Sequence, residues 1–116
     1  MKNGGDNNMC MKASLINKTI EHLRDNYPTD KKPIWVICTG YDCIEGPDGE
    51  KGFGVFVPET LEIYIATDVP QWEETLIETT AHEYKHFMQY CEGEPMDEEE
   101  AECFAYMILA EMKEKE

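Results

Sequence analysis

Two histidines and a glutamate in the second half of the chain are the residues best suited to do chemistry. His82 and His86 lie four residues apart, and Glu83 follows His82 directly, which gives the string HExxH. On a helix, residues four apart lie on the same face, one turn from each other. Two imidazoles with this spacing can bind one Zn²⁺, while the glutamate takes a proton from the metal-bound water. The pattern therefore predicts a Zn²⁺ cofactor, with His82 and His86 as ligands and Glu83 as the catalytic base.

The sequence around HExxH decides whether the string is functional, because it also occurs by chance on helices with two surface histidines. The two histidines lie off the apolar face of their helix, which is formed by Ile77, Tyr84 and Met88. The segment Leu61–Ala66 just upstream is expected to be an edge strand, which can hold an extended peptide by backbone hydrogen bonds. A second helix follows at once and carries carboxylates on the face that packs back toward the histidines. This context favours a metal site.

The elements before HExxH can be predicted from residue spacing. Residues 1–10 are expected to form a flexible N-terminal lead, and apolar residues at helical spacing predict a first helix over Met11–Asn26. Three strand-like segments separated by short turns favour an antiparallel meander, and they are Ile34–Cys38, Gly52–Val57 and Leu61–Ala66.

Two further helices are expected after the strands. The helix that carries HExxH begins near Gln71, where the apolar period changes, and should end near Gly93. Asp97 followed by Glu100 predicts an N-cap and its capping-box partner at the start of a last helix. The expected fold class is therefore α+β, with a small antiparallel-dominated sheet, in one domain over residues 11–116.

Composition limits the partners and the location of the protein. The 25 acidic and 10 basic residues give a formal charge of −15, which argues against a nucleic acid partner because no positive field attracts phosphates. Neither a membrane span nor a signal peptide pattern is evident. Five cysteines without a CxxC pair favour reduced thiols over a disulfide framework. We therefore expect a soluble, cytoplasmic protein that binds neither nucleic acid nor membrane, and its oligomeric state stays open.

The string Glu98-Glu99-Glu100-Ala101-Glu102, read together with HExxH, resembles the gluzincins. In these zinc peptidases, HExxH is followed on a later helix by a glutamate ligand in an ExxAD or ExxA motif, and Glu102 stands here in place of the Asp. The chain is most similar in size to the minigluzincins and more distantly similar to the ImmA/IrrE-like peptidases. The resemblance covers about residues 61–110. It implies a zincin-like metallopeptidase that cleaves a peptide or protein substrate.

The third ligand implied by the resemblance is Glu98, with Glu102 as an acidic group one turn further on. Glu102 begins a second ExxA string, and a helix pair that turns near Gly93 would place it closer in height to His86. Glu102 therefore stays open as the alternative third ligand.

Three tyrosines and the third histidine are further candidates for a role, and the sequence also allows two other functions. Tyr64, Tyr90 and Tyr106 are each candidates for an oxyanion-stabilising group. The third histidine, His22, has no evident partner on the first helix and is expected to be a surface or boundary residue. The alternative functions are a zinc-binding regulatory protein without catalysis and an acidic interaction protein without a metal.

Overall fold

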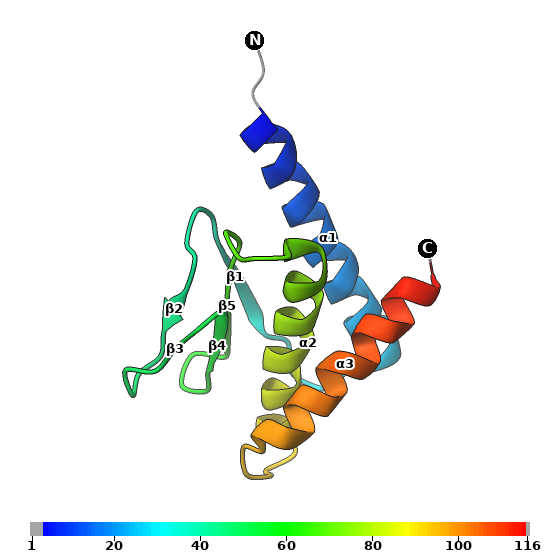
Figure 1. The fold of residues 1–116 in the computed structure, drawn as a ribbon. Coiled ribbons are helices and arrows are strands. Elements are labelled where there is room, and N and C mark those ends of the chain that lie inside the picture. Colours follow the sequence, from blue (N-terminus) through cyan, green and yellow to red (C-terminus); the bar gives the residue numbers. More distant parts are fainter. Residues whose placement is uncertain (1–3, 116) are drawn as a thin grey trace.

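Three helices and two small sheets make up residues 4–115, the part of the chain that the computed structural model describes (Figure 1). The helices are α1 (Gly4–Asn26), α2 (Trp72–Cys91) and α3 (Glu98–Glu114). The strands are β1 (Ile34–Cys38), β2 (Ile44–Glu45), β3 (Lys51–Gly52), β4 (Gly54–Val57) and β5 (Glu62–Ala66). The expected α+β class and the single domain are confirmed.

Helix α1 begins at Gly4, so the prediction that the helix starts at Met11 was wrong. The buried side chains of Ile16 and Leu23 anchor α1 against the rest of the molecule. Once such a helix is nucleated, each added residue gains one backbone hydrogen bond, so it extends through residues of poor propensity. The predicted flexible lead, residues 1–10, therefore overlaps α1, and its first three residues lie outside the described residues.

The main sheet has the strand order β1-β5-β4, and the predicted antiparallel meander was wrong. Strand β5 pairs in parallel with β1, from Ile34 opposite Glu62 to Cys38 opposite Ala66, and pairs antiparallel with β4. Parallel neighbours require a connection of a dozen or more residues, and the chain between β1 and β5 supplies it with the β2–β3 hairpin and β4. The segment expected at the edge is therefore central, and β4 is an edge strand of this sheet.

Helix α2 lies in the middle of the molecule, with the sheet on one side and α1 and α3 on the other (Figure 1). Phe87 of α2 is fully buried, and Tyr84 stacks on Trp35 of β1 with ring planes 11° apart. The Tyr84 hydroxyl donates a hydrogen bond of 2.6 Å to the carbonyl of Tyr27. Each large apolar side chain buried in this way stabilises the fold by roughly 1.5–3 kcal/mol. The helix that carries HExxH is thus fixed from both sides.

The turn between α2 and α3 has the predicted end and start signals. Gly93 adopts a positive φ of 73°, which L side chains rarely adopt, just after α2 ends. The Asp97 side chain accepts a hydrogen bond from the Glu100 N–H at 3.1 Å, as an N-cap does. The predicted end of α2 and the Asp97 N-cap are confirmed, but the Asp97 N–H donates to Gln89 and not to Glu100, so the predicted capping box is only half formed. Together these residues reverse the chain so that α3 packs back along α2.

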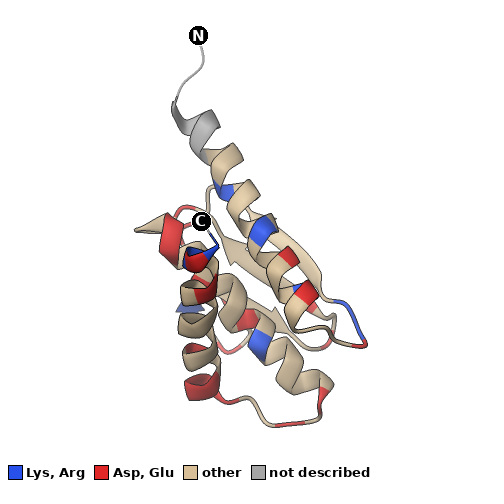
Figure 2. Ribbon diagram, turned by 90° about the vertical axis from the view of Figure 1, so that its right-hand side faces the viewer, with Lys and Arg blue, Asp and Glu red and all other residues tan. Residues whose placement is uncertain are grey.

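Acidic residues gather on this turn and on the first turns of α3, where Figure 2 shows the ribbon predominantly red. Glu98, Glu99 and Glu100 occupy the first turn of α3, where the partial positive charge of a helix N-terminus favours carboxylates.

Among the described residues, no helix combines the length and the hydropathy that a membrane span requires.

Candidate metal centre

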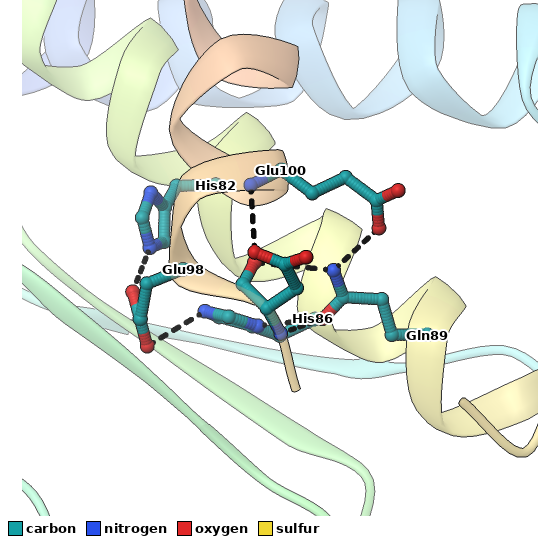
Figure 3. A network of polar contacts seen from close by, with 6 residues as sticks. His82, His86, Gln89, Glu98 and Glu100 are labelled. Atoms are coloured by element: carbon teal, nitrogen blue, oxygen red, sulfur yellow. Dashed lines mark hydrogen bonds and ion pairs between the residues drawn. The ribbon is translucent and has the colours of Figure 1, made fainter. Parts of the chain in front are cut away.

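His82 and His86 from α2 meet Glu98 from the first turn of α3 (Figure 3). His82 Nε2 lies 2.9 Å from Glu98 Oε1, and His86 Nε2 lies 3.1 Å from Glu98 Oε2. One donor atom from each residue falls within 4.8 Å of the other two. Ligand atoms around a tetrahedral zinc are separated by roughly 3.3 Å, given bonds of about 2.0–2.1 Å. The three side chains therefore form a donor set of two nitrogens and one oxygen with suitable spacing.

The feature that favours a metal most strongly is the buried Nε2 atom of the His86 ring. The residue is only 6% exposed, and its buried Nε2 atom has no hydrogen-bond partner, although it lies 3.1 Å from the Glu98 carboxylate. A buried polar atom without a partner costs free energy, so such atoms call for an explanation. A cation between His86 Nε2 and the Glu98 carboxylate would satisfy both groups.

Glu98 is suited to bind a cation because it stays ionised. Burial alone would raise the pKa of its carboxyl, but the hydrogen bond from His82 and the nearby imidazole of His86 lower the pKa overall. Its place at the start of α3 adds the partial positive charge of the helix N-terminus. At neutral pH the group is therefore an anionic ligand.

Glu83 lies beside the three donors, with only 9% of the residue exposed. Burial raises the pKa of its carboxyl to about 7, and the Glu98 carboxylate raises it as well, whereas His86 and the backbone N–H of Phe56 lower it. The carboxyl thus exchanges a proton near neutral pH, as a general base and acid must.

The four residues line one side of a cleft of about 670 Å³. Strand β4 lines it with Gly54, Val55 and Phe56, and Glu102 and Tyr106 of α3 extend it beyond Glu98. Glu102 is exposed and lies outside the cluster of donors, next to the hydroxyl of Tyr106. Of the two glutamates considered as third ligand, the structure therefore brings Glu98 to the histidines.

The three candidate tyrosines have different positions. Tyr106 lines the cleft, but Tyr64 donates a hydrogen bond to Glu62 at 2.7 Å, and Tyr90 packs against Phe56. Of these three tyrosines, only Tyr106 is among the residues that line the cleft.

His22 was predicted to be a surface or boundary residue without a nearby partner, and the structure contradicts this because the residue is buried and hydrogen bonded. The side chain is buried between α1 and α3, where Nε2 donates to Glu111 at 2.7 Å. The signal was missed because the partner lies 89 residues away in the sequence. The five cysteines are free thiols, as expected.

Sequence reasoning assigned no role to Gln89, which contacts His86 at 2.9 Å (Figure 3). The available signal was its position three residues after His86, since side chains three apart are neighbours on a helix.

Comparisons of the chain with models of protein families, with curated proteins and with solved structures give no match. The functional assignment therefore rests on the geometry and chemistry of the cleft.

Proposed function

We propose that this chain is a zinc-dependent metallopeptidase of the gluzincin type with a zincin-like fold. His82, His86 and Glu98 hold the Zn²⁺, and Glu83 is the catalytic base. The observation that carries the proposal is the convergence of three metal-binding side chains at the wall of a cleft, with a buried carboxyl beside them. Two imidazoles and one carboxylate leave a fourth position open, as catalytic zinc sites do.

The bound Zn²⁺ would supply a Lewis acid that polarises the scissile carbonyl and makes water acidic at neutral pH. Glu83 removes a proton from the attacking water as the oxygen bonds to the carbonyl carbon. It then returns the proton to the amine that leaves when the C–N bond breaks. Glu83 is suited to both steps because its carboxyl is buried beside the three donors, where burial raises its pKa in the metal-free site and a bound cation would favour the ionised form that accepts a proton.

Strand β4 supports a peptide as the substrate. One edge of β4 is paired with β5, and its residues Gly54–Phe56 line the cleft beside Glu83. An extended peptide that adds to this edge forms backbone hydrogen bonds that do not depend on its sequence. Its carbonyl groups would then run past the three donors, which places a scissile bond within reach of Glu83.

The proposal is tested by zinc content and hydrolysis of a quenched fluorescent peptide library, measured on the same preparations. The natural chain should hold about one zinc and cleave peptides. Glu83→Gln should keep the zinc and lose about 100-fold or more of the hydrolysis, because proton transfer by a positioned side chain contributes that much. Glu98→Ala should lose the zinc, whereas Glu102→Ala, one turn away on the same helix, should keep it.

Two results would overturn the proposal. Zinc that binds without any hydrolysis by the natural chain would indicate a zinc-binding protein without catalysis. A chain that takes up no zinc, even from added zinc salt, would have no metal site at all.

A further inference from the structure

The side chain of Gln89 is almost completely buried, with 1% of the residue exposed, and all of its polar atoms are used. Its Oε1 accepts hydrogen bonds from His86 Nδ1 at 2.9 Å and from the Asp97 N–H at 3.2 Å. Its Nε2 donates to the Asp97 carbonyl at 3.2 Å and to the Glu100 carboxylate at 2.8 Å. Figure 3 shows this network between the end of α2 and the start of α3.

The partners of Gln89 leave only one orientation of its amide. A backbone N–H can only donate, and a carbonyl and a carboxylate can only accept, so the amide oxygen has to face the Asp97 N–H. The same oxygen faces His86 Nδ1, and an oxygen without hydrogens can only accept there. His86 therefore carries a proton on Nδ1, and in the neutral ring the Nε2 lone pair faces Glu98 and the cleft.

The second pair of contacts positions the other helix. Asp97 is the N-cap of α3 and immediately precedes Glu98. Both backbone groups of Asp97 are hydrogen bonded to the Gln89 amide, and the Glu100 side chain is also bound to it. The predicted capping box is therefore only half formed, since Gln89 instead of Glu100 accepts from the Asp97 N–H. One amide thus fixes the ring of His86 and the start of the helix that carries Glu98.

We propose that Gln89 is the positioning residue of the metal centre, which sets the tautomer of His86 and the distance of Glu98 from it. The inference rests on the proposed function, because it assumes that His86 Nε2 and Glu98 bind the metal. Partners of the second ring nitrogen of a metal-binding histidine typically change metal affinity about 10–100-fold when they are removed.

The first test measures zinc affinity by competition with a chromogenic chelator. Gln89→Met keeps the length of the side chain and removes its polar atoms, and it should weaken zinc binding about 10–100-fold. The double variant Gln89→Glu with Glu100→Gln keeps the acceptor for His86 and for the Asp97 N–H and exchanges donor and acceptor toward residue 100, but it loses the donor to the Asp97 carbonyl, so it should recover part of the affinity. Gln71→Met replaces the other glutamine of the chain, which is exposed, and should bind zinc like the natural protein.

The second test reads the tautomer directly in the metal-free protein, from two-bond couplings to the ring nitrogens by NMR. The measurement is made on a Glu98→Ala background, because that change removes the carboxylate facing His86 Nε2. The pH is about 8.5, where imidazoles are neutral. His86 should be protonated on Nδ1, and adding Gln89→Met should shift the population toward Nε2. His22 is an internal reference of the opposite form, because its Nε2 donates to Glu111.

The outcomes separate the inference from the proposed function. If the natural chain binds zinc and Gln89→Met binds it equally well with an unchanged tautomer, the role of Gln89 is refuted and the peptidase proposal stands. If the natural chain binds no zinc, the proposed function fails and the positioning role fails with it, whatever the NMR spectra show. If Gln89→Met does not fold, the double variant decides, and loss of zinc binding in a folded double variant contradicts the proposal.

Discussion

His22 and His86 have opposite roles in this molecule, and the hydrogen-bond partners of their ring nitrogens distinguish them. His22 donates from Nε2 to Glu111, while its Nδ1 faces the donors Lys115 at 3.2 Å and Asn26 at 3.4 Å. His86 has the reverse arrangement, with Nδ1 bound to Gln89 and with Nε2 lacking a hydrogen bond, 3.1 Å from the Glu98 carboxylate. A ring with both nitrogens hydrogen bonded is a structural contact between helices, whereas a buried nitrogen without a hydrogen bond, facing a carboxylate, is available to a metal.

The contact between His22 and Glu111 gives a pH dependence of stability. The hydrogen bond from His22 is the main cause that lowers the pKa of Glu111 below its ordinary value of 4.5; burial opposes this, and the Tyr27 hydroxyl lowers it further. A carboxyl whose pKa is lower in the folded state stabilises the fold above the unfolded pKa, and the contribution is lost as pH falls through the folded value.

We expect Glu111→Gln to lower the free energy of unfolding at pH 7 by roughly 0.5–1 kcal/mol, a range that includes solvent screening of this partly exposed group. At a second, acidic pH well below the ordinary carboxyl value of 4.5, the difference between the two proteins should shrink, because the pKa of Glu111 is lowered in the folded state. Urea unfolding at both pH values measures it, with Glu114→Gln at the exposed end of α3 as control. An equal difference at both pH values would contradict the linkage.

At the scale of elements, the close approach of β4 to α2 is what places Glu83 in the cleft. A Cβ added at Gly54 would lie 2.7 Å from Thr79 Cγ2, 2.8 Å from the Tyr64 carbonyl oxygen and 3.2 Å from Glu83 Cγ. The carbonyl belongs to the backbone of β5 and cannot rotate away. Only glycine therefore allows the edge strand to lie this close to the helix.

Gly54→Ala should destabilise the protein by about 1–3 kcal/mol, as extra methyl groups in packed interiors do. Gly52→Ala, two residues earlier, is the matched control, because its Cβ would meet its nearest neighbour at an ordinary 3.7 Å. Thermal and urea unfolding of both variants measure the effect. Equal stability of the two variants would show that β4 and α2 can separate without cost.

The helices and HExxH could be predicted because their signals are local. The Asp97 cap and the turn at Gly93 lie within a few residues of the elements that they end or begin. The sheet could not be predicted in this way, since the pairing of β1 with β5 depends on contacts between distant segments. Local patterns also could not decide whether Glu98 or Glu102 is the third ligand. The two residues lie one helical turn apart, and only the path of the chain between α2 and α3 determines which of them meets the histidines.

For the whole molecule, the net charge of −15 bears on how a metal changes stability. Any divalent cation reduces repulsion among the acidic residues, so stabilisation by zinc alone would not identify a site. Mg²⁺ separates the two effects, because it prefers oxygen ligands in octahedral geometry and binds poorly to imidazoles.

Zinc at about 100 times its dissociation constant should stabilise the fold by about 2.7 kcal/mol, which raises the melting temperature by roughly 10 °C. Differential scanning fluorimetry measures the shift. The same concentration of Mg²⁺ should have little effect, EDTA should reverse the effect of zinc, and Glu98→Ala should not respond. Equal shifts with both metals would indicate screening of surface charge instead of a site.

All three proposed ligands come from one short stretch of chain, and this has a consequence for the order of assembly. His82 and Glu98 are 16 residues apart, whereas the parallel ladder joins Ile34 to Glu62. Short loops close at a lower cost in chain entropy and therefore sooner than long ones. The helical hairpin is then expected to form while β1 is still unpaired. When the complete chain refolds, the three proposed ligands would therefore come together before the sheet that frames the cleft is complete.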